Sequence, residues 1–314
     1  MARADQVRRK HLGNAVHFRG LVEISNHCRC NCLYCGLRRD NEKVRRYRMK
    51  PEEILSCARL AKKLGYGTVV LQSGEDPGCS AEMLAPVIRG IKRMGLAVTL
   101  SLGEREAEEY KLWKDAGADR YLLRHETADP ELYGYLRPGR RLADRLADLI
   151  LLRQMGYQVG MGFMTGLPGA EDRGCRADLK LMREMRPDMV GIGPFIPHPD
   201  TPFGREQGGE LSETLRMIAR VRLMLPYAHM PSTTALATLH PQGRLLGLQY
   251  GADVVMPNLT PAEYREDYTI YPGKAKPYDP CNEYRSLVKL LDECGLVMGK
   301  GPGHSIFYER RRKK

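Results

Sequence analysis

The sequence contains no long hydrophobic run. No apolar stretch approaches the ~20 residues that span a bilayer, and the start, Met1 to Asp5, lacks the apolar core of a secretory signal. With 42% hydrophobic and 28% charged residues, the chain is also neither disordered nor collagenous. We therefore expect a globular protein of the cytoplasm that has no membrane partner.

Acidic residues are in deficit, since 50 Lys and Arg against 38 Asp and Glu give a net charge of +12. Such an excess can indicate a nucleic-acid partner. Here no helix-turn-helix, zinc-finger or RNP pattern is present, and much of the excess lies in three runs without interleaved aromatics: Arg38–Arg48, Arg137–Arg145 and Arg310–Lys314. The distribution favours a solvated basic face with a few anion-binding arginines, and it predicts no nucleic-acid partner.

Short β-rich apolar runs alternate with amphipathic stretches along the chain, and each interval is long enough for one helix. Eight runs are predicted as strands: Val22–Ser25, Thr68–Gln72, Ala97–Leu102, Tyr121–His125, Val159–Thr165, Met189–Pro194, Pro231–Leu236 and Val254–Pro257. Eight such units predict an α/β fold, a (β/α)8 TIM-type barrel that is complete or nearly so. The same periodicity is compatible with a doubly wound open sheet.

Three segments are expected. Residues 1–17, weakly helical from Ala4 to His11, would cap the bottom of the barrel, and residues 18–280 would form the barrel, with a loop-rich closure over Pro257–Lys276. Residues 281–314 would form a helix over Glu283–Cys294 and a basic tail. Because the chain begins close to the first strand, we expect a barrel bottom that is exposed or covered by a partner.

Polar residues directly follow several predicted strands, as in Ser73-Gly74-Glu75-Asp76. In parallel α/β folds, ligands bind at the C-terminal ends of the strands. We therefore expect the functional site at that end of the barrel.

Four of the nine cysteines lie within eight residues, in the sequence Cys28-Arg-Cys-Asn-Cys-Leu-Tyr-Cys35. Three thiolates on one loop, those of Cys28, Cys32 and Cys35, can each ligate one iron of a [4Fe-4S] cluster and leave the fourth iron open for chemistry. The alternative is a closed zinc site completed by His27 or Cys30. No second cysteine pair lies nearby, so we favour the cluster, with Cys30 as a non-ligand that faces away.

This cysteine spacing, with an aromatic residue before the last cysteine, resembles that of the radical S-adenosylmethionine (SAM) superfamily. The resemblance implies that SAM chelates the open iron and that the reduced cluster cleaves it to a 5′-deoxyadenosyl radical, with an external one-electron reductant as the electron source. It also implies that Tyr34 packs beside the adenine, and that Gly74 and Glu75 belong to the segment that meets the SAM amino group.

Longer runs resemble one family in particular, the HydE maturases of [FeFe]-hydrogenase, which are close to the biotin-synthase and methylornithine-synthase group. The resemblance covers about residues 5–275. Its runs are Asn31–Asp40, Leu71–Pro77, Ser101–Glu104, Tyr121–Thr127, Gly193–Pro202 and Tyr271–Lys274.

Position by position, the resemblance implies that Glu126 binds the SAM ribose hydroxyls and that Arg145 pairs with the SAM carboxylate. It places further residues around the central cavity: Gln72, Thr99, Arg124, Met189, Thr233, Thr234, Tyr268 and Tyr271. The alternatives are a barrel salt bridge between Arg124 and Glu126, and plain barrel packing of Met189 and the two threonines. His125 alternates to the other face of its strand and is expected to be structural.

The same resemblance implies a small anionic substrate, a cysteine-bound iron that carries CO and cyanide and is delivered by a partner maturase. Some HydE proteins hold a second cluster on a C-terminal cysteine triplet, but only Cys281 and Cys294 lie in that region, so we expect none. Sulfur insertion of the biotin-synthase type is disfavoured, because the remaining cysteines fall outside the predicted strands. Two alternatives stay open: a methylornithine-synthase-like isomerase with an amino-acid-like substrate, and a non-catalytic iron–sulfur carrier or scaffold.

Overall fold

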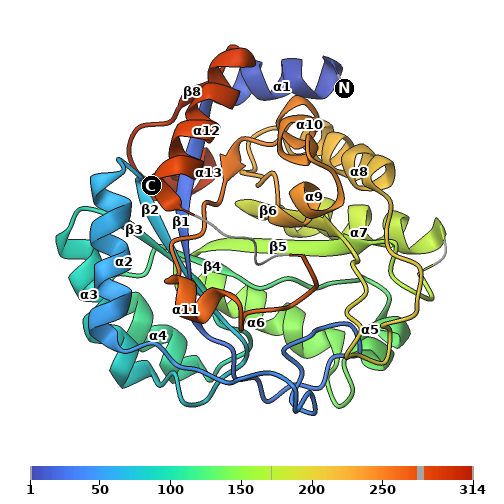
Figure 1. Cartoon of the computed structure of the whole chain (residues 1–314). Coiled ribbons are helices and arrows are strands. Elements are labelled where there is room, and N and C mark those ends of the chain that lie inside the picture. The colour runs from blue at the N-terminus through green and yellow to red at the C-terminus, as the bar shows by residue number, and fades with distance from the viewer. Residues whose placement is uncertain (1, 171, 274–278, 313–314) are drawn as a thin grey trace.

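The computed structural model describes residues 2–170, 172–273 and 279–312 (Figure 1). Within them, one parallel sheet has the strand order β6-β5-β4-β3-β2-β1-β7, and β8 also pairs with β1. The strands are β1 (Ala15–Ser25), β2 (Thr68–Ser73), β3 (Ala97–Ser101), β4 (Arg120–Leu122), β5 (Gln158–Thr165), β6 (Met189–Pro194), β7 (Val254–Val255) and β8 (Val297–Met298). The predicted α/β barrel class is confirmed, with sequential parallel strands from β1 to β6.

Helices lie around the outside of the curled sheet (Figure 1). They are α1 (Ala2–Leu12), α2 (Pro51–Lys63), α3 (Ala81–Arg93), α4 (Ala107–Asp115), α5 (Pro130–Leu136), α6 (Leu142–Gln154), α7 (Asp172–Met185), α8 (Leu211–Met224), α9 (Thr234–Leu239), α10 (Gly243–Gln249), α11 (Ala262–Arg265), α12 (Pro280–Glu293) and α13 (Ile306–Arg312). The core fills the space between sheet and helices, where Ile88, Leu100 and Trp113 have no exposed surface. No helix of the described residues is long and apolar enough to cross a membrane.

Capping residues fix where the outer helices start. Pro51 is the first residue of α2, and the preceding Lys50 N–H donates to Glu53 Oε2 at 2.6 Å. Ser80 Oγ accepts from Met83 N at 3.3 Å at the start of α3. These helix starts follow the loops that leave the C-terminal strand ends, so they also fix the frame of the barrel mouth.

The predicted seventh strand, Pro231–Leu236, is wrong. The segment is instead a short bridge between two sheet edges: Val190 N donates to His229 O at 2.9 Å, and Ser232 N donates to Val254 O at 2.9 Å. Proline cannot donate a ladder hydrogen bond, and the chain turns into α9 immediately afterwards. The ring from β6 to β7 is therefore closed by a bridge rather than by a full strand.

The remaining predicted strands are present with shifted ends. β1 starts at Ala15, before the predicted barrel boundary, and β4 spans Arg120–Leu122 rather than Tyr121–His125. β8 was not predicted; it lies in the segment 281–314 and pairs with β1 through Ala15 and Val16. The C-terminal segment thus contributes to the sheet, and the division into cap, barrel and C-terminal segment remains our proposal.

The N-terminal end of the barrel is crossed by residues 299–305. The buried guanidinium of Arg120 donates from Nη2 to the carbonyl oxygens of Pro302 at 2.5 Å and Gly303 at 2.9 Å. Gly303 has φ +57°, and a Cβ on it would lie 2.6 Å from His17 Cγ, so only glycine fits there. The expectation of an exposed or partner-covered bottom is therefore wrong, because the chain's own C-terminal segment covers it.

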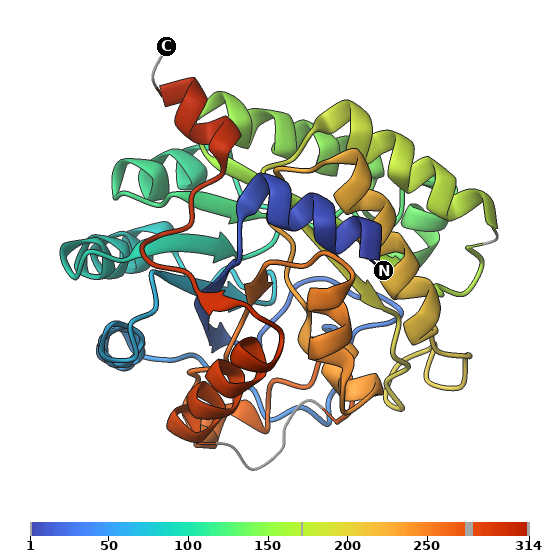
Figure 2. The same ribbon diagram turned by 90° about the horizontal axis from the view of Figure 1, so that it is seen from above.

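The predicted helices near the two termini are both found. α1 includes the predicted Ala4–His11 and packs on α8 and α10. Figure 2 shows α1 in blue, between α8 and the segment that runs from β8 to α13. α12 (Pro280–Glu293) overlaps the predicted Glu283–Cys294. Lys274 and Lys276 of the predicted closure, and the last two residues of the basic tail, lie outside the described residues.

Candidate active site

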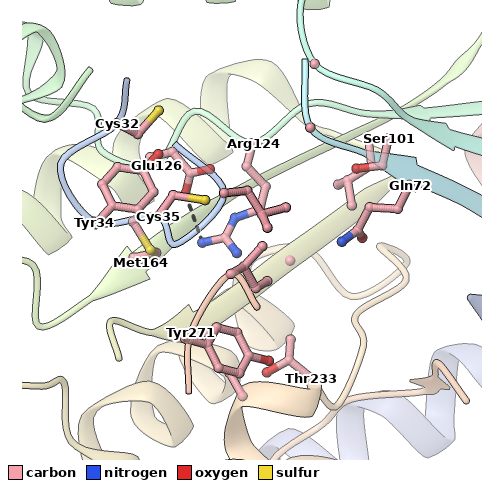
Figure 3. A pocket seen from close by; sticks show the side chains of 18 of the residues that line it. Cys32, Tyr34, Cys35, Gln72, Ser101, Arg124, Glu126, Met164, Thr233 and Tyr271 are labelled. Carbon is pink, nitrogen blue, oxygen red and sulfur yellow. Dashed lines mark ion pairs between the residues drawn. The ribbon is translucent and has the colours of Figure 1, made fainter. Parts of the chain in front are cut away.

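A cavity of about 330 Å³ lies at the C-terminal ends of the strands (Figure 3). All the site residues predicted from the sequence line it except Thr99 and Met189. Thr99 pairs with Arg120 in the β3–β4 register, and the sulfur of Met189 lies 2.9 Å from Arg19 Nη1, so both residues sit closer to the barrel bottom. The residues that do line the cavity are Cys28, Cys32, Tyr34, Cys35, Gln72, Gly74, Glu75, Arg124, Glu126, Arg145, Thr233, Thr234, Tyr268 and Tyr271.

The cysteines lie on the long loop between β1 and α2. The Arg46 guanidinium stabilises the conformation of this loop. It donates to four carbonyl oxygens of the loop, those of Asn26, Leu37, Arg38 and Asn41. The loop is also tied to the far side of the cavity, since Gly36 N donates to Ile270 O at 3.1 Å. A loop without regular secondary structure is thereby held in one conformation.

The thiols of the cysteine loop lie together at one cavity. None of the nine cysteines forms a disulfide, and four of them line this cavity: Cys28, Cys30, Cys32 and Cys35. A closed zinc site takes four ligands on one ion, whereas a [4Fe-4S] cluster with one open iron takes one thiolate on each of three irons. The loop therefore has the thiols that such a cluster needs.

The turn after β2 contacts the cysteine loop closely. A Cβ on Gly74 would lie 2.3 Å from His27 O and 2.8 Å from Cys28 Cβ, so only glycine allows this approach. Next to it, Glu75 O accepts from Arg29 N at 2.9 Å. The two loops therefore form one wall of the cavity, as expected of a segment that meets a ligand of the cluster.

Guanidinium groups surround the buried carboxylate of Glu75. Arg137 Nη2 lies 2.9 Å and Arg145 Nη2 3.4 Å from Oε1, while Arg140 Nη2 lies 3.2 Å from Oε2. Glu104 is bound by Arg145 Nε at 2.8 Å and by Arg140 Nη1 at 3.1 Å. Burial raises the pKa of Glu75, and the arginines oppose that effect. Arg29 Nε also lies 3.6 Å from Glu75 Oε2, so four guanidinium groups face two carboxylates, which leaves positive charge for another anionic group.

Several members of this network were not singled out in the sequence. The only signal for Arg137 and Arg140 was the basic run 137–145, and Arg137 is one of the anion-binding arginines rather than part of a solvated face, with a side chain only 6% exposed. The role of Glu104 depends on long-range contacts that have no local pattern. The expectation that Cys30 faces away is wrong, because its thiol lines the cavity and donates to Glu75 Oε2 at 3.0 Å.

Arg124 and Glu126 follow β4 and face the cavity together (Figure 3). Arg124 Nη2 lies 3.0 Å from Glu126 Oε2, so the barrel ion pair that the sequence allowed is present. The Nε of Arg124 is buried and has no hydrogen-bond partner among the described residues. One donor thus remains for a ligand. As expected, His125 lies on the other face, fully buried beside Asp178.

The opposite wall carries hydroxyl groups. Tyr268 OH accepts from Gln72 Nε2 at 3.2 Å, and Tyr271 lies near Thr233 (Figure 3). Burial raises the pKa of Tyr271, so its hydroxyl stays protonated. Thr233 Oγ1 is buried and lacks a hydrogen-bond partner among the described residues. This wall therefore offers neutral donors to whatever occupies the cavity.

An apolar cluster completes the site on the side of Tyr34. Its buried members are Leu132, Leu136, Leu167, Phe195 and Phe203, with Leu33, Tyr34 and Met164 packed against them. A flat aromatic ligand group fits such surroundings, as the expected place of the adenine requires. Met164, which also lines the cavity, had no distinguishing pattern in the sequence.

Comparison with known proteins agrees with this geometry. The family model of the Radical SAM superfamily matches residues 22–182. The [FeFe] hydrogenase maturase subunit HydE of Thermotoga maritima is 49% identical over 96% of this chain and 85% of its own length. The 3-methylornithine synthase of Methanosarcina barkeri is 30% identical over 98% of this chain and 85% of its own length.

Among solved structures, the crystal structure of methylornithine synthase (PylB) superposes with a TM-score of 0.85 and 28% identity, covering 95% of this chain and 87% of that one. The barrel fold is thus shared with a radical SAM enzyme. The resemblance predicted from the cysteine loop and the strand ends is confirmed. The chain is a radical SAM enzyme and belongs, within that superfamily, to the HydE maturase family.

Proposed function

We propose that this chain is a maturase that acts on a cysteine-bound iron carrying CO and cyanide, the precursor of the two-iron subcluster of [FeFe]-hydrogenase. The observation that carries the proposal is the identity of 49% to HydE over 96% of the chain, together with the predicted residues that meet around one cavity. A partner maturase would deliver the precursor, and an external reductant would supply one electron.

The cofactors that the family implies are a [4Fe-4S] cluster and SAM. Cys28, Cys32 and Cys35 would hold the cluster, and when both groups are bound they supply a 5′-deoxyadenosyl radical. Glu126 would accept hydrogen bonds from the ribose hydroxyls, since a carboxylate offers two acceptor oxygens. Arg145 would pair with the SAM carboxylate, favoured by the excess of guanidinium over carboxylate around Glu75.

The substrate would lie between Arg124 and the hydroxyl wall. Arg124 Nε and Thr233 Oγ1 are buried donors without partners among the described residues, and they face an anion from two sides. Thr234, Tyr268 and Tyr271 line the same space. The cyanide nitrogen and the CO oxygens can accept hydrogen bonds from such groups. The buried walls would also keep water away from a reactive radical. We assign Thr99 and Met189 to the layer beneath this space.

The test compares two substrates in the anaerobically reconstituted protein. One is a synthetic cysteine-bound iron dicarbonyl cyanide complex; the other is lysine, of which 3-methylornithine is an isomer. The proposal predicts that the iron complex stimulates 5′-deoxyadenosine formation and that lysine does not. Stimulation by lysine alone would move the isomerase to first place, and absence of SAM cleavage under all conditions would favour the carrier.

A further inference from the structure

Glu126 has an unusual backbone conformation. It is one of two non-glycine residues of the described chain with positive φ, at +64°. Thr127 N donates to His125 O at 2.8 Å across it, so Glu126 is the central residue of a γ-turn with positive φ, a rare and strained turn. Such a conformation persists only where the surroundings hold it in place.

The strand β5 holds one side of this turn. His125 N and Glu126 N both donate to Gly162 O, at 2.9 and 3.0 Å, and Met164 N donates to Glu126 O at 3.0 Å. These bonds fix the backbone of Glu126 to the sheet. They leave the residues after the turn to be fixed by another element.

That element is α7, through Asp178. One carboxylate oxygen of Asp178 lies 3.1 Å from His125 Nε2 and accepts from Ala128 N at 2.7 Å. The side chains of His125 and Asp178 are 0% and 4% exposed. One buried oxygen of Asp178 thus contacts the chain on both sides of Glu126, from the face opposite the cavity.

We propose that Asp178 is a positioning residue that holds the strained turn and thereby aims the Glu126 carboxylate into the cavity. This inference rests on the proposed role of Glu126 as the ligand of the SAM ribose. Without the Asp178 contacts, the turn relaxes toward negative φ, and the Glu126 side chain turns away from Arg124 and from the cofactor. Neither Asp178 nor His125 needs to touch SAM for this effect.

The experiment is a double-mutant cycle on the reconstituted holoenzyme, with the KM for SAM, kcat and bound iron as readouts. Asp178→Ala is expected to raise the KM for SAM about tenfold, equivalent to one lost hydrogen-bonding interaction of a charged group, while kcat at saturating SAM and the iron content stay within about twofold. In a Glu126→Ala background, Asp178→Ala is expected to change KM no further. Asp178→Asn, whose amide oxygen still accepts from Ala128 N and from the histidine ring, restores most of the affinity.

A control exists at the other end of the barrel, where a second buried His–Asp pair also binds a backbone N–H. His229 Nδ1 lies 2.5 Å from Asp253 Oδ2, and Asp253 Oδ1 accepts from Met230 N at 2.8 Å. Unlike Asp178, Asp253 also pairs with a buried arginine, Arg222, at 2.8 Å. Asp253→Ala is expected to lower stability without changing the KM for SAM. If Asp178→Ala does not fold, His125→Ala takes its place with His229→Ala as its control.

The variants distinguish a wrong assignment of Glu126 to the ribose from a wrong positioning role of Asp178. An unchanged KM in Glu126→Ala, in a protein that still cleaves SAM, overturns the assignment of Glu126 to the ribose. A raised KM in Glu126→Ala, combined with an Asp178→Ala variant that has no effect or an additive one, overturns the positioning role of Asp178 alone.

Discussion

The two ends of the barrel contain similar side chains and use them differently. Each end has a buried His–Asp pair and buried arginines, and each keeps a few donors without partners. At the bottom, residues 299–305 cross the barrel, and their carbonyl oxygens accept from Arg120. At the mouth, no segment among the described residues takes that position, and a cavity of about 330 Å³ lies there.

The difference shows that buried polar groups do not by themselves mark an active site. What distinguishes the mouth is open volume beside those groups, together with a loop that brings four thiols to its edge. The bottom uses the same chemistry for stability, as is usual for the N-terminal face of such barrels. Variants at the two ends should therefore separate activity from stability.

The largest effect is expected at the mouth, for Cys32→Ala. Removal of one of the three proposed cluster ligands should abolish SAM cleavage, with 5′-deoxyadenosine formation lowered by more than about a hundredfold and iron content reduced. Cys281→Ala, at an exposed thiol of α12, is the control and should behave like the wild type. Retained cleavage in Cys32→Ala would contradict the assignment of the ligands.

The next effect is expected at the bottom, for Gly303→Ala. Its control is Gly295→Ala, because both glycines have positive φ, +57° and +61°, but an added Cβ clashes with His17 only at Gly303. Urea unfolding should show a loss of about 1 kcal/mol for Gly295→Ala and about 3 kcal/mol for Gly303→Ala. SAM cleavage below the unfolding transition should be retained. Equal losses in the two variants would mean that the packing of residues 299–305 against His17 is not what stabilises the bottom.

For Thr233→Val we expect smaller effects, with activity lowered and stability unchanged or slightly raised. The hydroxyl is buried without a partner among the described residues, so its removal should leave stability unchanged or slightly raised. Activity with the iron complex should fall about three- to tenfold, the size of one hydrogen bond. Denaturation curves and substrate-dependent 5′-deoxyadenosine formation measure the two quantities. Loss of stability with unchanged activity would place Thr233 in the packing instead.

The smallest effect is expected for the pH dependence of stability at the barrel bottom, through His17. Burial, and then the neighbouring His229 and Arg19, lower the pKa of His17 from 6.5 to about 4. The folded state therefore binds fewer protons than the unfolded chain between these values, so stability is complete above pH 6.5 and falls as the pH drops toward 4. Between pH 7 and 5 the wild type should lose about 1 kcal/mol more than His17→Gln in urea titrations. Identical slopes would show that His17 does not carry this dependence.

Much of the barrel could be predicted from the sequence because strands and helices leave periodic patterns. Pro231–Leu236 misled the prediction, since its β-rich composition belongs to a bridge and a helix start. The bottom segment could not be predicted, because backbone carbonyls of residues such as Pro302 and Gly303 do the binding and leave no side-chain pattern.

In the site, too, residues with a local sequence pattern could be predicted and those without one could not. The thiols and the strand-end residues could be predicted from the motif and the family resemblance. Arg137, Arg140 and Glu104 could not, because each acquires its role only through a partner distant in the sequence. The strained turn at Glu126 could not be predicted either, since glutamate does not favour positive φ and the turn's contacts come from β5 and from Asp178, both distant in the sequence.

The most direct test of the account is low-temperature EPR of the anaerobically reconstituted and reduced protein, recorded with and without SAM. The account predicts a [4Fe-4S] signal that changes when SAM is added, because SAM would bind the open iron beside the arginine and glutamate side chains of the mouth. A cluster signal indifferent to SAM, or a bound zinc in place of the cluster, would contradict it.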